Sequence, residues 1–174
     1  MARPESKARE GLARPRVPDD PAGFVALAQD AANAYDTAWP LTVYAPDIRL
    51  EVLGDGIHDV HNGIDDVRPA LELLYGWFDR TQARISKTLV ATSSDTIVNL
   101  ADGVILNGQT IHGAEFWKFD QHGQVVHNLL YTSVNPKPLS HPLALLRMLI
   151  GHPRPALTHL AVQLRQYRRP APTR

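Results

Sequence analysis

Hydrophobic positions recur with helical spacing in two stretches of the first half of the chain. The first stretch begins at Asp20-Pro21, where a side-chain oxygen can cap a helix and a proline is tolerated at the first helical position. The second begins near Asp65. Their apolar stripes are Phe24, Leu27, Ala28, Ala31, Ala34 and Tyr35 in the first stretch, and Val67, Leu71, Leu74 and Phe78 in the second. These spacings predict two helices, which end before Trp39-Pro40 and near Asp79 respectively.

Alternating apolar and polar residues predict strands in the rest of the chain. A half-buried strand is expected at 48–52, followed by a polar loop from Gly54 to Gly63. A hairpin turn is expected at Asn107-Gly108, because a type I′ turn favours this pair. Further strands are predicted at about 84–92, 95–106, 109–119 and 124–134. Helices followed by an antiparallel meander indicate an α+β fold, in which N-terminal helices cover one face of a curved sheet.

The composition is that of one ordinary globular domain, with 44% hydrophobic and 21% charged residues in a chain of 174. The sequence has no cysteine, which excludes disulfides, thiolate metal sites and cysteine nucleophiles and favours a reducing, cytoplasmic setting. No apolar run is long enough to span a membrane. We expect a mobile leader at 1–19, one domain at 20–135 and a basic, helical C-terminal extension at 136–174.

The formal net charge of zero hides an uneven distribution of charged residues. Residues 21–136 hold fourteen acidic and six basic residues, whereas 137–174 hold seven basic residues and no acidic one. An acidic body argues against nucleic acid as a partner, because such binding depends on basic groups that meet phosphates. Two amphipathic stripes are expected in the extension, Leu143, Leu146 and Ile150, then Leu157, Leu160, Leu164 and Tyr167. Packing on the acidic body is the preferred interpretation, and contact with an anionic membrane surface is the alternative.

Glu115 is the first candidate for chemistry. Alternation along 109–119 places it on one face with Ile111, Gly113, Trp117 and Phe119. If that face meets the helices, loss of water favours the neutral form of the carboxylic acid, which can donate a proton at neutral pH. The alternatives are that Glu115 pairs with Arg84, Lys87 or a helix end, or that the opposite face points inward.

Tyr35 and Asp36 form the second candidate, at the end of the first predicted helix. An acidic residue is disfavoured there, because the exposed carbonyls carry partial negative charge. Asp36 is therefore a candidate functional residue, although an Asp at this place more commonly serves the turn that follows a helix. Asn99 and Asn128 interrupt apolar strands, where they could orient a ligand or satisfy a neighbouring backbone group.

The segment from His58 to Asn62 is the one stretch that resembles a metal site. Its two histidines lack a third ligand at zinc-site spacing, so a polar loop with Asp65 capping the next helix is the preferred interpretation. Phosphate-binding, dinucleotide, nucleophile-elbow and zinc-protease motifs are absent from the sequence. We therefore expect neither a metal nor a cofactor.

Three short motifs occur in a characteristic order. They are Tyr44-Ala45-Pro46-Asp47, then HNGIDDV at 61–67, then EFWKFDQHGQV at 115–125. Over about residues 22–135, the chain resembles the nuclear transport factor 2-like superfamily. The resemblance implies a cone, in which a curved antiparallel sheet wraps around helices and encloses an apolar pocket. It also implies a homodimer formed through the outer face of the sheet.

The superfamily includes ketosteroid isomerase, limonene epoxide hydrolase, scytalone dehydratase, SnoaL-like polyketide cyclases and members that only bind. Glu115 falls where ketosteroid isomerase carries a protonated oxyanion-hole acid. Tyr35 and Asp36 are similar to a pocket-facing pair in scytalone dehydratase. The base position of ketosteroid isomerase corresponds to Val52 here. The pocket positions that we expect to bind substrate are Val52, Asn99, Trp117, Phe119, Asn128 and Leu130.

The resemblance and the carboxylates together predict a cofactor-independent acid–base enzyme, a dehydratase, isomerase or cyclase. Its substrate would be an apolar polyketide-like or terpenoid small molecule of specialised metabolism. Asp36 would act as the base with help from Tyr35, and Glu115 as the buried acid. One alternative is an epoxide hydrolase or epoxide-opening cyclase. The other is a non-catalytic module that binds a small molecule or a protein.

Overall fold

The computed structural model describes residues 15–54 and 57–135, together with Leu146, Ile150, Gly151 and Leu157. The chain divides into two units, Met1–Asn135 and Pro136–Arg174. The four described residues of the second unit are helical, and the other residues of the two stripes predicted there lie outside the described part. So do residues 1–14 of the predicted leader. Within the described residues, no helix is both long and apolar enough to cross a membrane.

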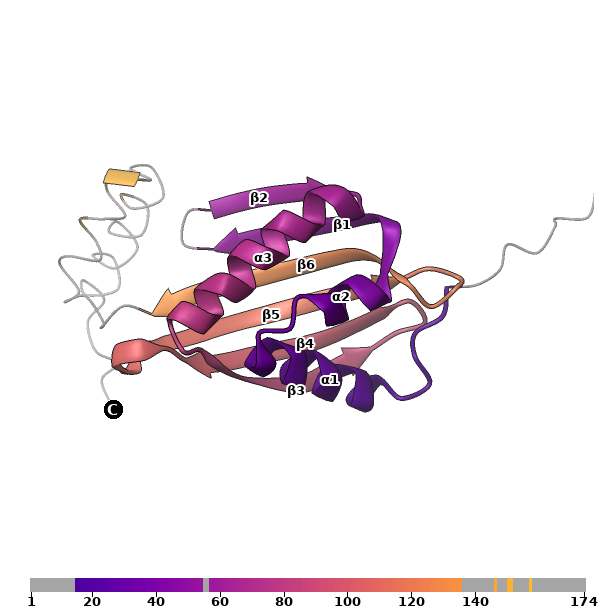
Figure 1. Ribbon diagram of the computed structural model, residues 1–174, viewed down its shortest axis with the longest axis horizontal. Coiled ribbons are helices and arrows are strands. Elements are labelled where there is room, and N and C mark those ends of the chain that lie inside the picture. The colour runs from indigo at the N-terminus through magenta and orange to yellow at the C-terminus, as the bar shows by residue number, and fades with distance from the viewer. Residues whose placement is uncertain (1–14, 55–56, 136–145, 147–149, 152–156, 158–174) are drawn as a thin grey trace, which may run out of the picture. The chain divides into compact units, whose positions relative to one another are not determined.

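The first unit combines helices with one six-stranded sheet (Figure 1). Its elements are α1 Pro21–Ala34, α2 Ala38–Val43, β1 Tyr44–Gly54, β2 Ile57–Asn62, α3 Ile64–Arg80, β3 Arg84–Thr92, β4 Thr96–Val104, the 3₁₀ helix Leu106–Gly108, β5 Thr110–Phe119 and β6 Val125–Asn135. The strands lie in the order β2-β1-β6-β5-β4-β3. All neighbouring pairs are antiparallel except β1 and β6, which are parallel.

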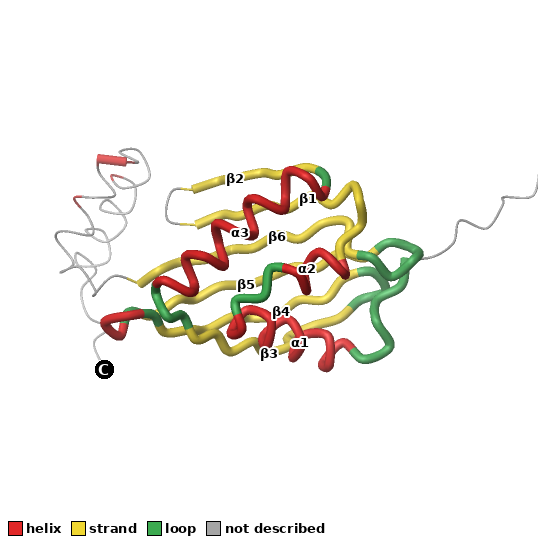
Figure 2. The backbone as a smooth tube through the Cα atoms, viewed as in Figure 1, coloured by secondary structure: helices red, strands yellow, loops and turns green. Residues whose placement is uncertain are grey.

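The helices lie on one face of the sheet (Figure 2), where α1 contacts β3, and α3 contacts β1 and β2. The two long helices, α1 and α3, each bury an apolar stripe against this face. The predicted α+β architecture, a curved sheet covered by N-terminal helices, is therefore confirmed.

Local chemistry explains where the two long helices begin. Asp20 caps α1, since its carboxylate accepts a hydrogen bond from the backbone N–H of Gly23 at 2.9 Å. The predicted cap of the other long helix is wrong, because Gly63 rather than Asp65 occupies the cap position of α3. Gly63 has a φ of 81°, a conformation that glycine adopts without steric cost. Two residues of the stripe predicted for α1, Leu27 and Ala34, are exposed.

Three local predictions differ from the structure. The polar loop predicted at 54–63 is mostly the edge strand β2, which pairs with Arg49–Gly54 of β1. The predicted type I′ turn at Asn107-Gly108 is instead a 3₁₀ helix, in which only Gly108 has positive φ. No helix or strand was predicted between Trp39-Pro40 and Tyr44, where the structure has the short helix α2. Each difference involves a short element, which has too few residues to show a clear periodic pattern of apolar and polar positions.

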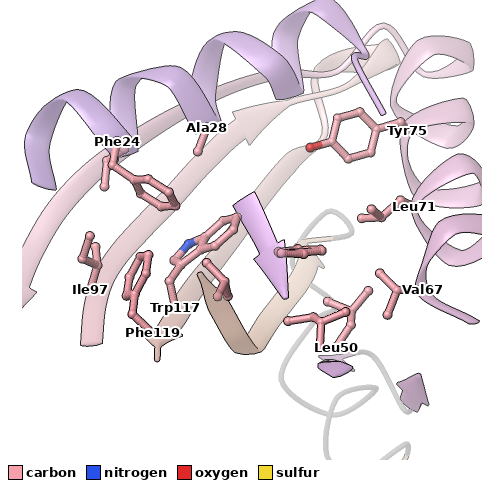
Figure 3. Packing of buried hydrophobic residues seen from close by; sticks show 13 residues of the cluster. Phe24, Ala28, Leu50, Val67, Leu71, Tyr75, Ile97, Trp117 and Phe119 are labelled. Carbon is pink, nitrogen blue, oxygen red and sulfur yellow. The ribbon is translucent and has the colours of Figure 1, made fainter. Parts of the chain in front are cut away.

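Large aromatic side chains fill one end of the space between helices and sheet (Figure 3). Phe24 of α1 lies edge-on to Trp117 and Phe119 of β5, with ring centroids 5.2 and 5.4 Å apart. Trp39 of α2 lies 5.5 Å from Phe24. The segment before α1 contacts the turn between β5 and β6, because Arg16 donates its backbone N–H to the Asp120 carbonyl at 2.9 Å. The aromatic cluster fixes the register of β5, which carries Glu115.

Candidate active site

A row of small residues leaves the other end of the inner sheet face hollow. Ala101, Gly113 and Thr132 are successive partners on β4, β5 and β6, and Gly54 of β1 approaches the backbone of Thr132. Larger apolar side chains of α3 line the same space, namely Leu74, Tyr75 and Phe78. The result is a mainly apolar cavity of about 530 Å³, a volume typical of small-molecule sites.

Glu115 projects from β5 into the wall of this cavity and is 8% exposed. Its Oε2 atom accepts three hydrogen bonds, from Lys87 Nζ at 2.5 Å and from Asn99 Nδ2 and Trp117 Nε1 at 3.2 Å each. This convergence of donors is typical of an ionised carboxylate, whereas the sequence favoured a neutral acid. The alternative that paired Glu115 with Lys87 describes the observed contact. Within residues 15–54 and 57–135, no side chain or backbone group donates to the other oxygen, Oε1.

Lys87 is the second charged residue in the cavity wall. It stands beside Ala101 in the strand register, and this small neighbour leaves its side chain room to cross β4 towards Glu115. The side chain is only 6% exposed, and Nζ lies 5.6 Å from the centre of the Trp117 ring. One N–H of the ammonium group bonds Glu115. The other two have no acceptor among the described residues, so they are available to a ligand.

Tyr75 adds a neutral polar group to the same cavity. Its ring projects from α3 away from the helix axis, with the hydroxyl at the far end (Figure 3). Burial, with the nearby negative charges of Glu115 and Asp36, raises the pKa of Tyr75 above its ordinary value, so the hydroxyl stays protonated. It has no hydrogen-bond partner in the part of the chain that the structure describes. The sequence analysis missed Tyr75, although its place one residue after Leu74 on the inward helix face was a signal.

The six predicted substrate-binding positions divide into two groups. Val52 and Leu130 line the cavity. The other four, Asn99, Trp117, Phe119 and Asn128, are buried in the surrounding packing and do not line it. Asn99 supports Glu115, as described above, and Asn128 donates to the Tyr44 hydroxyl at 2.9 Å. These four residues therefore pack behind the wall of the cavity and support it, and they do not face its interior.

Tyr35 and Asp36 lie at the end of α1 and do not line the cavity. Asp36 is exposed, and its Oδ1 accepts the backbone N–H of Ala38 at 2.8 Å. This is the turn-stabilising role that the sequence left as an alternative. The Tyr35 hydroxyl lies 3.4 Å from the Ala83 carbonyl and accepts from Arg84 at 3.2 Å. The structure therefore does not bring Asp36 and Glu115 together in this cavity.

The two histidines of the predicted polar loop point in different directions from β2. His58 lies 3.4 Å from a carboxylate oxygen of Glu51, and His61 lies 3.5 Å from one of Asp66. His61 and Asp59 line the cavity. Among the described residues, no group of three histidine or acidic side chains is arranged to hold a metal ion.

Comparisons with known sequences give little information about the first unit. One family model matches residues 147–173, and its description is the fifth domain of the ATP-dependent helicase/deoxyribonuclease AddB. This match lies in the second unit, almost wholly outside the described residues. No curated protein matches the chain.

Solved structures, in contrast, match the first unit. An NTF2-like protein of unknown function from Mesorhizobium loti is 15% identical with a TM-score of 0.54, over 68% of this chain and 97% of its own. A SnoaL-like protein of unknown function from Burkholderia thailandensis is 17% identical with a TM-score of 0.51, over 66% and 94%. The epoxide hydrolase/cyclase-like enzyme SalBIII, described as acting in pyran ring formation in the polyether salinomycin, is 13% identical with a TM-score of 0.50, over 66% and 95%.

These identities are too low to carry a function from one protein to another. The structural matches agree, however, with the α+β architecture that the structure shows, a six-stranded sheet with helices on one face. The chain has the nuclear transport factor 2-like fold.

Proposed function

We propose that the protein is a cofactor-independent acid–base enzyme that acts on an apolar small molecule carrying a carbonyl group. The observation that carries this proposal is the Glu115–Lys87 pair in the wall of a mainly apolar cavity. Oε1 of Glu115 is free to take up a proton, and two N–H groups of Lys87 are free to bind an oxygen. Enolisation requires a base that removes a proton and a positive group that stabilises the negative charge developing on the oxygen. The pair provides both.

The reaction begins when the substrate carbonyl oxygen accepts hydrogen bonds from Lys87 and from the Tyr75 hydroxyl. Oε1 of Glu115 then removes a proton from the carbon next to the carbonyl. The negative charge that develops on the oxygen is stabilised by the ammonium group, in a site from which apolar walls exclude water. Return of the proton at another carbon isomerises a double bond. Loss of a hydroxyl group eliminates water, and attack on a second carbonyl closes a ring.

The proposal assigns the proton transfer to Glu115 because Asp36 does not line the cavity. The substrate class remains an apolar polyketide-like or terpenoid small molecule, since the cavity walls are mainly aliphatic and aromatic. A carbonyl group on it is what Lys87 would bind. The likeness to SalBIII favours epoxide opening as a second candidate. In that reaction, the Lys87 ammonium would protonate the epoxide oxygen, and the product would be a diol or a cyclic ether.

The test uses benzylacetone, an apolar methyl ketone, as a probe of proton abstraction. Exchange of its α-hydrogens in heavy water is followed by NMR, with and without the protein. Glu115→Gln keeps the size of the side chain but removes the base, so exchange should slow by about a hundredfold or more. Glu72→Gln makes the same chemical change at an exposed position of α3 and should leave the rate unchanged.

Two results would contradict the proposal. If the native protein exchanges the probe no faster than Glu115→Gln does, the cavity is a binding site rather than an active site. If Asp36→Asn abolishes exchange and Glu115→Gln does not, the base is Asp36, as the sequence first indicated. Formation of a diol from a terpenoid epoxide, without ketone exchange, would favour the second candidate.

A further inference from the structure

Lys87 combines three properties that are seldom found together in a lysine. Its side chain is almost fully buried, the residue lines a mainly apolar cavity, and a carboxylate oxygen lies 2.5 Å from its Nζ. Buried lysines are used as nucleophiles because an apolar setting disfavours the ammonium form. We infer that Lys87 forms a covalent imine with apolar aldehydes and ketones in the cavity, and that Glu115 handles the protons. This inference rests on the proposed function for the kind of ligand, and it adds a covalent bond that the proposed function does not need.

The setting of Lys87 differs from that of the other described lysine. The sequence has four lysines, Lys7, Lys87, Lys118 and Lys137, of which Lys87 and Lys118 lie in the described part. The side chain of Lys118 is 55% exposed, and its Nζ lies 3.9 Å from Asp95. An exposed, hydrated ammonium group of this kind is a poor nucleophile. Lys118 therefore serves as an internal reference for Lys87.

Attack on a carbonyl carbon requires Nζ of Lys87 in its neutral amine form. Moving one proton from Nζ to the Glu115 carboxylate converts two opposite charges into a neutral amine and a neutral acid. Asn99 and Trp117, which donate to the same carboxylate oxygen, favour the charged pair while the cavity holds water. An apolar ligand that displaces this water raises the cost of the two charges and shifts the balance towards the neutral pair.

The covalent step is balanced without an oxidant or a reductant. The lone pair of Nζ forms a bond to the carbonyl carbon, and the carbonyl electron pair moves to the oxygen, which takes up a proton as nitrogen loses one. The carbon–oxygen bond of this carbinolamine then breaks. The oxygen leaves as water with the proton held by Glu115, and a protonated imine remains on Lys87. The sum is ammonium plus carbonyl giving protonated imine plus water, with Glu115 again a carboxylate.

The product preserves the electrostatics of the site. A protonated imine carries one positive charge next to the Glu115 carboxylate and the Trp117 ring, as the ammonium group does. Its α-carbon is more acidic than that of the parent ketone, because the cationic nitrogen accepts the electron pair. Glu115 is placed on the same side of the sheet to remove that proton. The site is therefore suited to forming an enamine as well as an enol, and an enamine can form a new carbon–carbon bond.

The experiment compares Lys87 with Lys118 in one sample of the native chain. The protein is incubated with benzaldehyde and sodium cyanoborohydride, which reduces an imine to a stable benzylamine. Peptide mass mapping then gives the rate of benzylation at each lysine. Lys87 should react about tenfold faster than Lys118 or more. In concentrated urea the two rates should become equal, because the difference depends on the folded cavity.

Variants sharpen the comparison. Lys118→Arg, a change at the exposed reference position, should leave Lys87 labelling unchanged. Ethylbenzene, which fills an apolar cavity but has no carbonyl group, should protect Lys87 and not Lys118. Labelling of Lys87 at or below the rate of Lys118 in the native protein would overturn the inference.

The inference and the proposed function can fail separately. Exchange of benzylacetone that depends on Glu115, in a protein whose Lys87 is not labelled, would overturn the imine and leave the acid–base proposal standing. Rapid labelling of Lys87, with exchange that does not depend on Glu115, would support the imine and reject the acid–base proposal.

Discussion

Glu51 shows how a single side chain on the outer sheet face couples stability to pH. Its Oε1 accepts a hydrogen bond from Arg49 Nε at 2.7 Å and lies 3.0 Å from His127 Nε2. Its Oε2 lies 3.4 Å from His58 Nε2. These contacts, the Arg49 hydrogen bond first, lower the pKa of Glu51 to about 2. The folded protein therefore binds a proton at Glu51 less readily than the unfolded chain does.

Replacing Glu51 by Gln should change the acid limb of the stability curve. The folded pKa of about 2 lies below the ordinary value of 4.5, so the contribution is present above pH 4.5 and is lost as pH falls towards 2. Glu51→Gln should lower the free energy of unfolding at neutral pH and flatten its decline over this interval. Urea unfolding at a series of pH values measures both effects. Parallel curves for the native and variant proteins would contradict the expectation, and Glu72→Gln is the matched control.

At the scale of single elements, replacing two different glycines by alanine should have opposite effects on the free energy of unfolding. A Cβ on Gly113 of β5 would lie 2.6 Å from the Tyr131 carbonyl oxygen of β6, so Gly113→Ala must push the two strands apart. It should lower the free energy of unfolding by about 1–3 kcal/mol. A Cβ on Gly76 of α3 meets nothing within 4 Å, so Gly76→Ala should stabilise the protein by about 1 kcal/mol. Urea unfolding measures both, and equal signs for the two variants would contradict this account.

The elements that the sequence predicted correctly are those with a long hydrophobic period. The helices α1 and α3 and the four strands of the meander each bury alternate or helically spaced residues. β2 was missed because it is an edge strand. Its residues 57–59 are exposed and 60–61 only half-buried, so its sequence carries no strong apolar alternation. Its pairing with β1 depends on the fold as a whole.

The sequence alone could predict only those features of the site that a single strand determines. Alternation along β5 identified the face that carries Glu115, because the pleat of a strand is a local property. The partnership with Lys87 depends on the register of three strands, and no local pattern fixes that register. Asp36 was expected in the pocket from its place at a helix end, but the short turn into α2 keeps it exposed at the surface.

At the scale of the whole domain, the outer face of the sheet is unusually apolar. Leu100, Phe116 and Tyr131, on β4, β5 and β6, are 48, 36 and 45% exposed. The rings of Phe116 and Tyr131 meet edge to face, with centroids 6.1 Å apart. An antiparallel sheet with one face on a core normally presents polar residues on the other. A contiguous apolar patch on the opposite face marks a surface for association, and we expect it to join two copies of the chain.

If the chain forms the expected dimer, Phe116→Asp should convert it into a monomer. A charge at the centre of the patch would be buried without a partner in the dimer, so the dissociation constant should rise about thirtyfold or more. Leu27→Asp, at a 55% exposed position of α1 on the other side of the sheet, should leave the dimer intact. Sedimentation equilibrium over a range of concentrations measures both, and a native protein that stays monomeric throughout would refute the dimer. Because the cavity lies under the helices and not on the outer face, the Phe116→Asp monomer should retain the Glu115-dependent exchange of benzylacetone.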